Sequence, residues 1–159
     1  MKKELLQEFA ARVTQANRSE LVVVIYEATL ASIAEGKQRL AEGQVEEART
    51  EIARARGMIT ELMGSLDLQY EISHYLRQLY IFAYQELCQG IALRKPERFD
   101  HASDIFEKLL PSFKEVAKQD DSDAVMENVQ TIYAGLTYGR GTLNETIGTG
   151  VENNRGFQA

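Results

Sequence analysis

The sequence is sparing with residues that cross-link or interrupt a chain. Its single cysteine, Cys88, cannot form an intrachain disulfide, which agrees with a reducing compartment. Only two prolines, Pro96 and Pro111, occur in 159 residues, and six of the eleven glycines lie in residues 120–159. Residues 1–119 therefore contain long stretches without a helix breaker, and the chain is long enough for one domain with its own core.

The sequence also lacks the charge and hydropathy patterns of several protein classes. The net charge is −6 and no cluster of lysine and arginine is present, so we expect neither nucleic acid nor an anionic membrane as a partner. No stretch is long and apolar enough to span a bilayer. Glu4 follows two lysines directly and no apolar core comes after it, so we expect no signal peptide and a cytoplasmic location.

What the sequence does contain is a helical repeat of apolar residues. We predict helices over residues 2–16, 18–42, 44–66 and 68–93, and a fifth that carries Phe99 to Val116. In the third helix, apolar residues recur at spacings of three and four, at Val45, Ala48, Ile52, Ala55, Ile59, Leu62 and Leu66. The fold class expected from this pattern is all-α: an antiparallel up-down four-helix bundle over residues 1–119, with an extra short N-terminal helix.

Residues 120–159 differ in composition from the bundle. They carry a net charge of −4, from two arginines against six acidic residues, and they are rich in glycine. We predict an acidic, mostly irregular tail that is partly helical near residues 123–136. The apolar side chains between Tyr133 and Tyr138 either dock on the bundle or remain solvated.

Several residues are typical of helix ends. Asn17 and Glu20 have the spacing of a capping box at the start of the second helix. Gly43 is expected to end that helix, and Pro96 to separate the fourth helix from the fifth. Pro111 lies inside the fifth helix, where it should bend the helix or remove one backbone hydrogen bond.

The fourth helix combines a predicted cap with an excess of apolar residues. Ser65 or Asp67 is expected to cap it. The residues predicted to face the core are Ile72, Leu76, Leu79, Ala83 and Leu87, with Tyr75, Tyr80, Phe82 and Tyr84 around them. One core-facing stripe does not require that many large side chains, so this helix offers a second apolar surface.

The sharpest candidate for chemistry is Glu71-x-x-His74. Di-iron bundles use two such motifs, but Arg98 stands three residues before the other histidine, His101, so the second motif is absent. We therefore predict that His74 lies on a solvated helix face, and we predict no catalytic residue, no cofactor and no metal. A helical metal-binding or enzyme subunit that uses Glu71 and His74 is the alternative function.

Surplus apolar surface is also present at the N-terminal end of the chain. The stretch ELVVVIYEATL, residues 20–30, is apolar around much of a helix circumference. The extra face must cover the first helix, a partner, or each in turn. The first helix presents its own apolar face, formed by Leu5, Leu6, Phe9 and Val13.

Two blocks of the sequence resemble the flagellar secretion chaperone family FliS, over roughly residues 10–118. In VTQANRSELVVVIYEATL, the matching residues are Ala16, Leu21, Tyr26 and Leu30, while Arg18 replaces the usual proline and Glu27-Ala28 replaces Asp-Gly. In ARGMITELMGSLDLQYEISHYLRQLYIFAYQEL, the matching residues are Ile59, Glu61, Leu62, Leu66, Asp67, Ile72, Leu76, Leu79 and Tyr80.

The resemblance implies a chaperone that binds the C-terminal segment of flagellin, prevents its premature polymerisation and assists its delivery to the flagellar export apparatus. The partner-binding residues expected on this basis are Leu21, Val22, Ile25, Tyr26, Thr29, Met58, Leu62, Leu66, Tyr75 and Tyr80. The apolar face of the first helix acts either as a removable lid or as a permanently packed fifth helix. Self-association, and a helical adaptor for another client, remain open.

Overall fold

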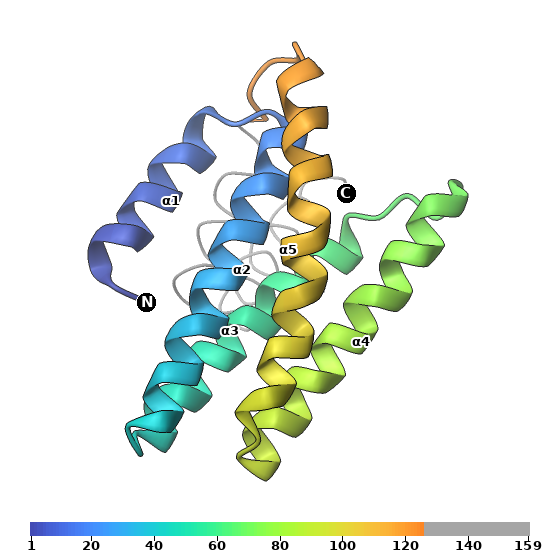
Figure 1. Cartoon of the computed structure of the whole chain (residues 1–159). Helices are drawn as coiled ribbons and strands as arrows, with labels where there is room; N and C mark the ends of the chain where they lie inside the picture. Colours follow the sequence, from blue (N-terminus) through green and yellow to red (C-terminus); the bar gives the residue numbers. More distant parts are fainter. Residues whose placement is uncertain (126–159) are drawn as a thin grey trace, which may run out of the picture.

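Five helices form the fold, and they confirm the all-α prediction (Figure 1). The computed structural model describes residues 1–125. The helices are α1 (Lys3–Gln15), α2 (Arg18–Ala41), α3 (Val45–Gly64), α4 (Glu71–Leu93) and α5 (Pro96–Gln119). Each observed end lies within three residues of the predicted one, and no strand occurs in residues 1–125.

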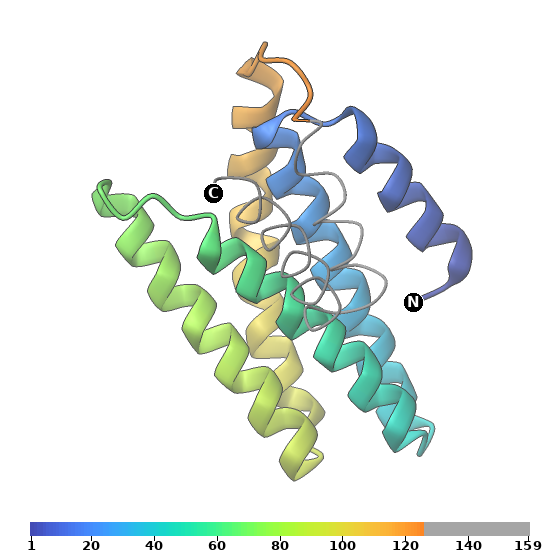
Figure 2. The same ribbon diagram turned by 180° about the vertical axis from the view of Figure 1, so that it is seen from behind.

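The four long helices form an up-down bundle in which sequence neighbours run antiparallel. Helix α2 packs against both α3 and α5, and α4 completes the bundle through its contacts with α3 and α5. The short helix α1 lies outside this ring and packs along α2, on the side away from α5 (Figures 1 and 2). The expected division into a bundle and one extra helix is therefore present.

An aromatic cluster occupies the middle of the bundle. The ring of Tyr26 on α2 meets Phe106 of α5 edge-on, with centroids 5.1 Å apart, and Phe106 stacks on Tyr80 of α4 at 6.0 Å. The hydroxyls of Tyr26 and Tyr80 form a hydrogen bond with each other. Because both tyrosines are almost completely buried, this bond satisfies polar groups that would otherwise destabilise the core.

The ends of α2 follow the predicted signals. The Oδ1 atom of Asn17 accepts a hydrogen bond from the Glu20 backbone N–H at 2.9 Å, and a Glu20 carboxylate oxygen accepts the Asn17 N–H at 3.0 Å. The capping box is therefore confirmed. Gly43 follows the helix with a φ of 77°, a left-handed conformation that glycine adopts without a steric penalty.

The predicted cap of α4 is wrong. The N-cap residue is Tyr70, which makes no side-chain cap hydrogen bond. Asp67 instead accepts the Gln69 N–H at 3.0 Å, and the Ser65 hydroxyl donates to the Leu62 carbonyl at 2.8 Å. Because α4 begins three residues later than predicted, neither side chain is placed to cap it. Each instead forms a hydrogen bond near the end of α3 or in the turn that follows.

The predicted core face of α4 is also wrong, because at two positions the buried residue is the one that follows the predicted residue. Ile72 is 63% exposed and Leu79 is 38% exposed, although Ala83 and Leu87 are buried as expected. The buried residues of α4 are Ser73, Tyr80, Ala83, Glu86, Leu87 and Gly90. The small residues decide the orientation: a Cβ atom at Gly90 would lie only 2.6 Å from the ring of Phe99, so α5 approaches closely at that face.

Helix α5 continues through Pro111, so this proline costs one backbone hydrogen bond and does not end the helix. Its apolar repeat is buried only in part. Phe106 is fully buried and Phe113 is partly buried, whereas Val116 is 54% exposed. The bundle is therefore less tightly closed around the C-terminal end of α5.

Residues 120–125 continue beyond α5 without helical structure and turn back toward the start of α2. Of the helical turns predicted near residues 123–136, residues 123–125 are not helical. The remainder, with the side chains from Tyr133 to Tyr138, lies outside the described residues.

Candidate partner-binding groove

A cleft of about 640 Å³ opens where α2 begins, α3 ends and α4 begins. Its apolar wall is formed by Leu21, Val22, Ile25, Leu62, Leu66, Leu76, Tyr80 and Phe113. Arg18, Glu61 and Asp67 supply charged groups of both signs to the lining, and Ser65 and Ser73 supply hydroxyls. We call this cleft the groove. Its composition suits an amphipathic ligand, which has an apolar face and charged flanks.

Helical spacing brings these side chains to one place. Leu21 and Ile25 are four residues apart on α2, so they project from one helix face, whereas Leu62 lies in the last turn of α3 and Leu66 follows the end of that helix. On α4, the residues are Ser73, Leu76 and Tyr80, with spacings of three and four. Three helix ends thus contribute one short apolar stripe each.

The bottom of the groove is neutral and held in place. Tyr80 lines the groove, and its hydroxyl is bonded to that of the buried Tyr26. Burial raises the pKa of both phenols above the ordinary value, so both stay protonated at neutral pH. The almost completely buried Tyr80 therefore supports the lining of the groove without adding a charge that a ligand would have to match.

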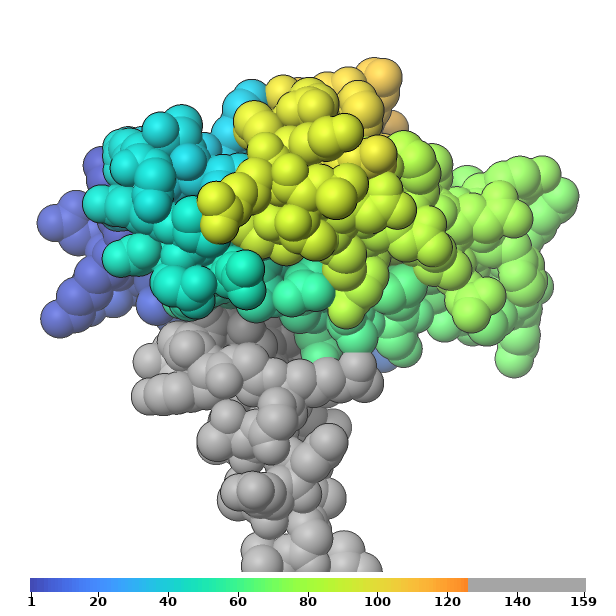
Figure 3. All heavy atoms as spheres, turned by 90° about the horizontal axis from the view of Figure 1, so that it is seen from below, coloured from blue at the N-terminus to red at the C-terminus, as the bar shows by residue number. Residues whose placement is uncertain are grey.

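A second apolar surface runs along the outside of α4. Ile72, Tyr75, Leu79 and Phe82 recur at spacings of three, four and three, and they are 38% to 63% exposed. Leu68 and Tyr70 in the preceding turn are exposed as well. We call the four helical residues the α4 outer face. The start of α4 projects at one end of the molecule in Figure 3, and aligned exposed apolar residues are typical of interaction sites.

The structure distributes the ten predicted partner-binding residues over three environments. Those that line the groove are Leu21, Val22, Ile25, Leu62, Leu66 and Tyr80, of which Leu62 and Tyr80 are also core residues at most 2% exposed. Tyr75 lies on the α4 outer face. Tyr26, Thr29 and Met58 are buried in the core, at most 2% exposed, and the Thr29 hydroxyl donates to the Ile25 carbonyl.

Sequence reasoning missed two parts of this surface. Leu76 and Phe113 line the groove, but their apolar repeats predicted only core positions. Ile72 and Leu79 were assigned to the core and belong to the α4 outer face. The sequence contained a signal for this arrangement, because α4 carries two apolar repeats that are offset by one residue. Only the repeat that contains small residues can approach α5 closely.

The four residues of the predicted lid all lie at the contact between α1 and the bundle. Phe9 and Val13 are buried, and Leu5 and Leu6 are partly buried against the core. None of these residues lines the groove. Helix α1 therefore covers a different face of α2 from the one that the groove exposes.

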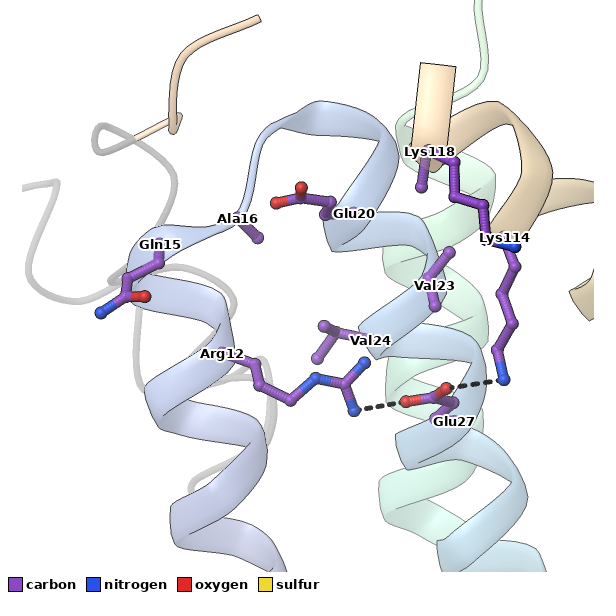
Figure 4. Close-up of a pocket in the computed structure, with 10 residues that line it drawn as sticks. Arg12, Gln15, Ala16, Glu20, Val23, Val24, Glu27, Lys114 and Lys118 are labelled. Atoms are coloured by element: carbon purple, nitrogen blue, oxygen red, sulfur yellow. Dashed lines mark hydrogen bonds and ion pairs between the residues drawn. The ribbon is translucent and has the colours of Figure 1, made fainter. Parts of the chain in front are cut away.

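A second cleft, of about 620 Å³, separates α1 from α2 and α5 (Figure 4). Val23 and Val24 form part of its wall. Across it, Arg12 of α1 and Lys114 of α5 both form ion pairs with Glu27 of α2. One carboxylate thus connects three helices at the edge of the cleft. On this side α1 is held by an ion pair across an open space and not by continuous apolar packing.

The candidate chemical motif occupies a solvated position. Glu71 and His74 are both exposed at the start of α4, as predicted for His74. Within residues 1–125, no group of three or more His, Cys, Asp or Glu side chains is placed to hold a metal ion. Over the same residues, no helix is long and apolar enough to cross a membrane.

Comparison with known protein families gives a match that spans the described helices. The family described as flagellar protein FliS matches residues 1–120 of the 159 residues, a span that includes all five helices. No curated protein sequence matches the chain.

Proposed function

The chain belongs to the FliS family of flagellar chaperones, and from this membership we propose that it binds the C-terminal segment of flagellin in the cytoplasm. In this proposal the bound segment is kept from polymerising and is presented to the flagellar export apparatus. The observation that carries the proposal is the pair of apolar surfaces at the start of α4, the groove and the α4 outer face.

The two surfaces suit a peptide that folds as it binds. Ordering one residue of a free chain costs about 1–2 kcal/mol, whereas burying one large apolar side chain returns about 1.5–3 kcal/mol. A helical peptide carries such a side chain at only about half of its positions, so a short contact barely offsets the ordering cost. A ligand that uses both the groove and the α4 outer face gains the additional burial that it needs.

The charges around the groove favour an oriented ligand. Arg18 lies at the start of α2, while Glu61 and Asp67 lie at the end of α3 and in the turn that follows. A bound helix therefore meets a positive group at one wall and negative groups at the other. Such an arrangement contributes more to orientation and specificity than to affinity.

Helix α1 is proposed as a lid over a further part of the binding surface. Its contacts with the four-helix ring are made mainly with α2, together with an ion pair between the Met1 amino group and Glu51 of α3. Because Phe9 and Val13 cover apolar surface of the core cluster, release of α1 would extend the surface open to a client. The competing state of α1 is permanent packing, which a deletion distinguishes below.

Single charges on the α4 outer face test the proposed function. We expect Ile72→Asp and Leu79→Asp each to weaken binding of a flagellin C-terminal peptide by about tenfold or more, because a carboxylate cannot be buried against the peptide without a partner. Both positions are exposed, so the bundle should keep its stability. The measurement is isothermal titration calorimetry.

Gln78→Asp is the matched control, because it adds the same residue to another exposed position of α4. Its affinity for the peptide should equal that of the unmodified chain. Equal affinities for all three variants, or no binding of the peptide by the unmodified chain, would contradict the proposed binding surface.

A further inference from the structure

The segment that follows α5 returns to the turn between α1 and α2. The Asn17 amide donates hydrogen bonds to the carbonyls of Asp120, at 3.1 Å, and Ser122, at 3.4 Å. The Val125 N–H donates to the Ala16 carbonyl at 3.1 Å. The Ser19 hydroxyl donates to the Asp120 carboxylate. Four hydrogen bonds therefore join residues more than 100 positions apart in the sequence.

These bonds involve the two residues that connect α1 to α2. Ala16 is the C-cap of α1 and Asn17 is the N-cap of α2. Any swing of α1 away from α2 must change the backbone at this hinge. The two ends of the Asn17 side chain have separate roles, since Oδ1 caps α2 while Nδ2 binds the segment after α5.

The segment itself is shaped to make these contacts. The Asp120 carboxylate accepts hydrogen bonds from the Ser122 N–H, at 2.9 Å, and from the Ser122 hydroxyl. This local turn directs the following backbone toward the hinge, where Val125 is partly buried against the core. The contact therefore combines backbone hydrogen bonds with one apolar anchor.

We propose that residues 120–125 act as a latch on the α1–α2 hinge, so that release of α1 from the bundle is coupled to release of this segment. The other attachments of α1 are side-chain contacts along its length, such as Phe9, Val13 and the ion pair of Arg12 with Glu27. Those contacts resist separation of α1 from the bundle, whereas the latch holds Ala16 and Asn17, the residues about which α1 would have to rotate.

The coupling is reciprocal. If a docked latch favours the docked α1, then a docked α1 favours the docked latch by the same free energy. The regulatory consequence rests on the proposed function: a client that displaces α1 must also overcome the latch, and anything that draws residues 120–125 away from the hinge eases binding. The coupling itself is a property of the chain alone.

Asn17→Ser tests the latch without removing the cap, because a serine oxygen can accept the Glu20 N–H as asparagine does. The serine side chain lacks the amide that reaches Asp120 and Ser122. Hydrogen exchange followed by mass spectrometry, on the full chain without any peptide, should show the α1 amides exchanging roughly fivefold faster or more, since each net hydrogen bond contributes about 1 kcal/mol.

Val125→Pro and Val125→Ala form a second, independent pair. Proline removes the N–H that donates to the Ala16 carbonyl, whereas alanine keeps it and removes only the apolar anchor. We expect faster α1 exchange in the proline variant and a smaller change in the alanine variant. Amides around Ala83 in the core of α4 serve as an internal reference and should be unchanged in both.

The reciprocal experiment is Phe9→Ala, which weakens the packing of α1 at a site outside the latch. Exchange of the Val125 amide should then become faster. The latch is wrong if α1 exchange is unchanged in both Asn17→Ser and Val125→Pro, or if Phe9→Ala leaves the Val125 amide protected. These results are distinct from failure of the proposed function, because a chain that binds no flagellin peptide still reports the coupling in exchange.

Discussion

At the scale of single residues, one side chain can serve two structures at once. Asn17 supplies the cap of α2 through its oxygen and binds the segment after α5 through its nitrogen. The first role follows from the Asn-x-x-Glu spacing, which is a local signal. The second needs the end of α5 to arrive beside the hinge, and no pattern near Asn17 indicates it.

The pKa of Asp120 offers a direct test of the geometry at the hinge. Hydrogen bonds from Ser122, and then from Ser19, lower it from 3.8 to about 2. Because the folded value lies below the ordinary one, these bonds stabilise the turn at Asp120 above about pH 4, and the contribution is lost as the pH falls toward 2. Of these bonds, the one from Ser19 joins the segment to α2. Asp120 forms no ion pair with another residue of 1–125.

We therefore expect Ser122→Ala to raise the pKa of Asp120 toward 3.8, and Ser19→Ala to raise it less. The measurement is an NMR titration of the Asp120 carboxyl carbon. Added salt should leave the value nearly unchanged, since hydrogen bonds and not neighbouring charges cause the shift. A pKa in Ser19→Ala equal to that in the unmodified chain would contradict the docked position of Asp120.

At the scale of helices, the orientation of α4 is set by what its neighbours can approach. Two apolar repeats run along α4, and by hydrophobicity alone either could face the core. The observed core side carries Ser73, Ala83 and Gly90, which allow close contact, and the other side carries Ile72 and Phe82. The small residues therefore allow close approach on the packed face, where Tyr80 and Leu87 are also buried, and the large residues of the other face remain available to a partner.

Gly90→Ala tests this explanation. The new Cβ would meet the Phe99 ring at 2.6 Å and the Arg98 Cβ at 3.3 Å, and Phe99 is fully buried. We expect a loss of about 1–3 kcal/mol in the free energy of unfolding, typical of an overpacked core. Urea unfolding followed by circular dichroism measures the change.

Gly57→Ala is the matched control on α3. No atom of another helix lies within 4 Å of its added Cβ, so alanine should stabilise the helix by about 0.5–1 kcal/mol. If the two variants change the unfolding free energy by the same amount, the close approach of α4 and α5 is not what fixes the orientation of α4.

At the scale of the whole molecule, residues 1–125 divide into a ring of four helices and two attached pieces. Helix α1 and residues 120–125 both contact the start of α2, and they meet each other at the hinge. The ring contains the aromatic core of Tyr26, Tyr80 and Phe106. The ring therefore keeps a core of its own when α1 is released, which is a requirement for a removable lid.

Deleting residues 1–16 tests the lid and keeps the Asn17 cap of α2. We expect the ring to unfold cooperatively at a melting temperature lower by roughly 10 °C, since the burial of Phe9 and Val13 is lost. Affinity for the flagellin peptide should rise by about tenfold, because the closed state no longer competes. Loss of cooperative folding without any gain in affinity would instead establish α1 as a permanently packed helix.

The sequence by itself determined the helices, most of their ends and the bundle architecture. These features rest on local rules: the apolar repeat of α3, the capping box of Asn17 and Glu20, and the left-handed Gly43. Each depends on residues a few positions apart, so one sequence contains the whole signal. The resemblance to the FliS family was likewise visible in two short blocks, and the family match confirmed it.

Only the tertiary structure decided which apolar side chains are buried and which remain exposed. Tyr26 and Met58 belong to the core, while Tyr75 and Ile72 face outward. A helix with two apolar repeats fixes its rotation only when a neighbour with the complementary shape packs against it, as α5 does at Gly90. The contact of residues 120–125 with the hinge also depends on where α5 ends in space, because hydrogen bonds between distant residues leave no periodic pattern in the sequence.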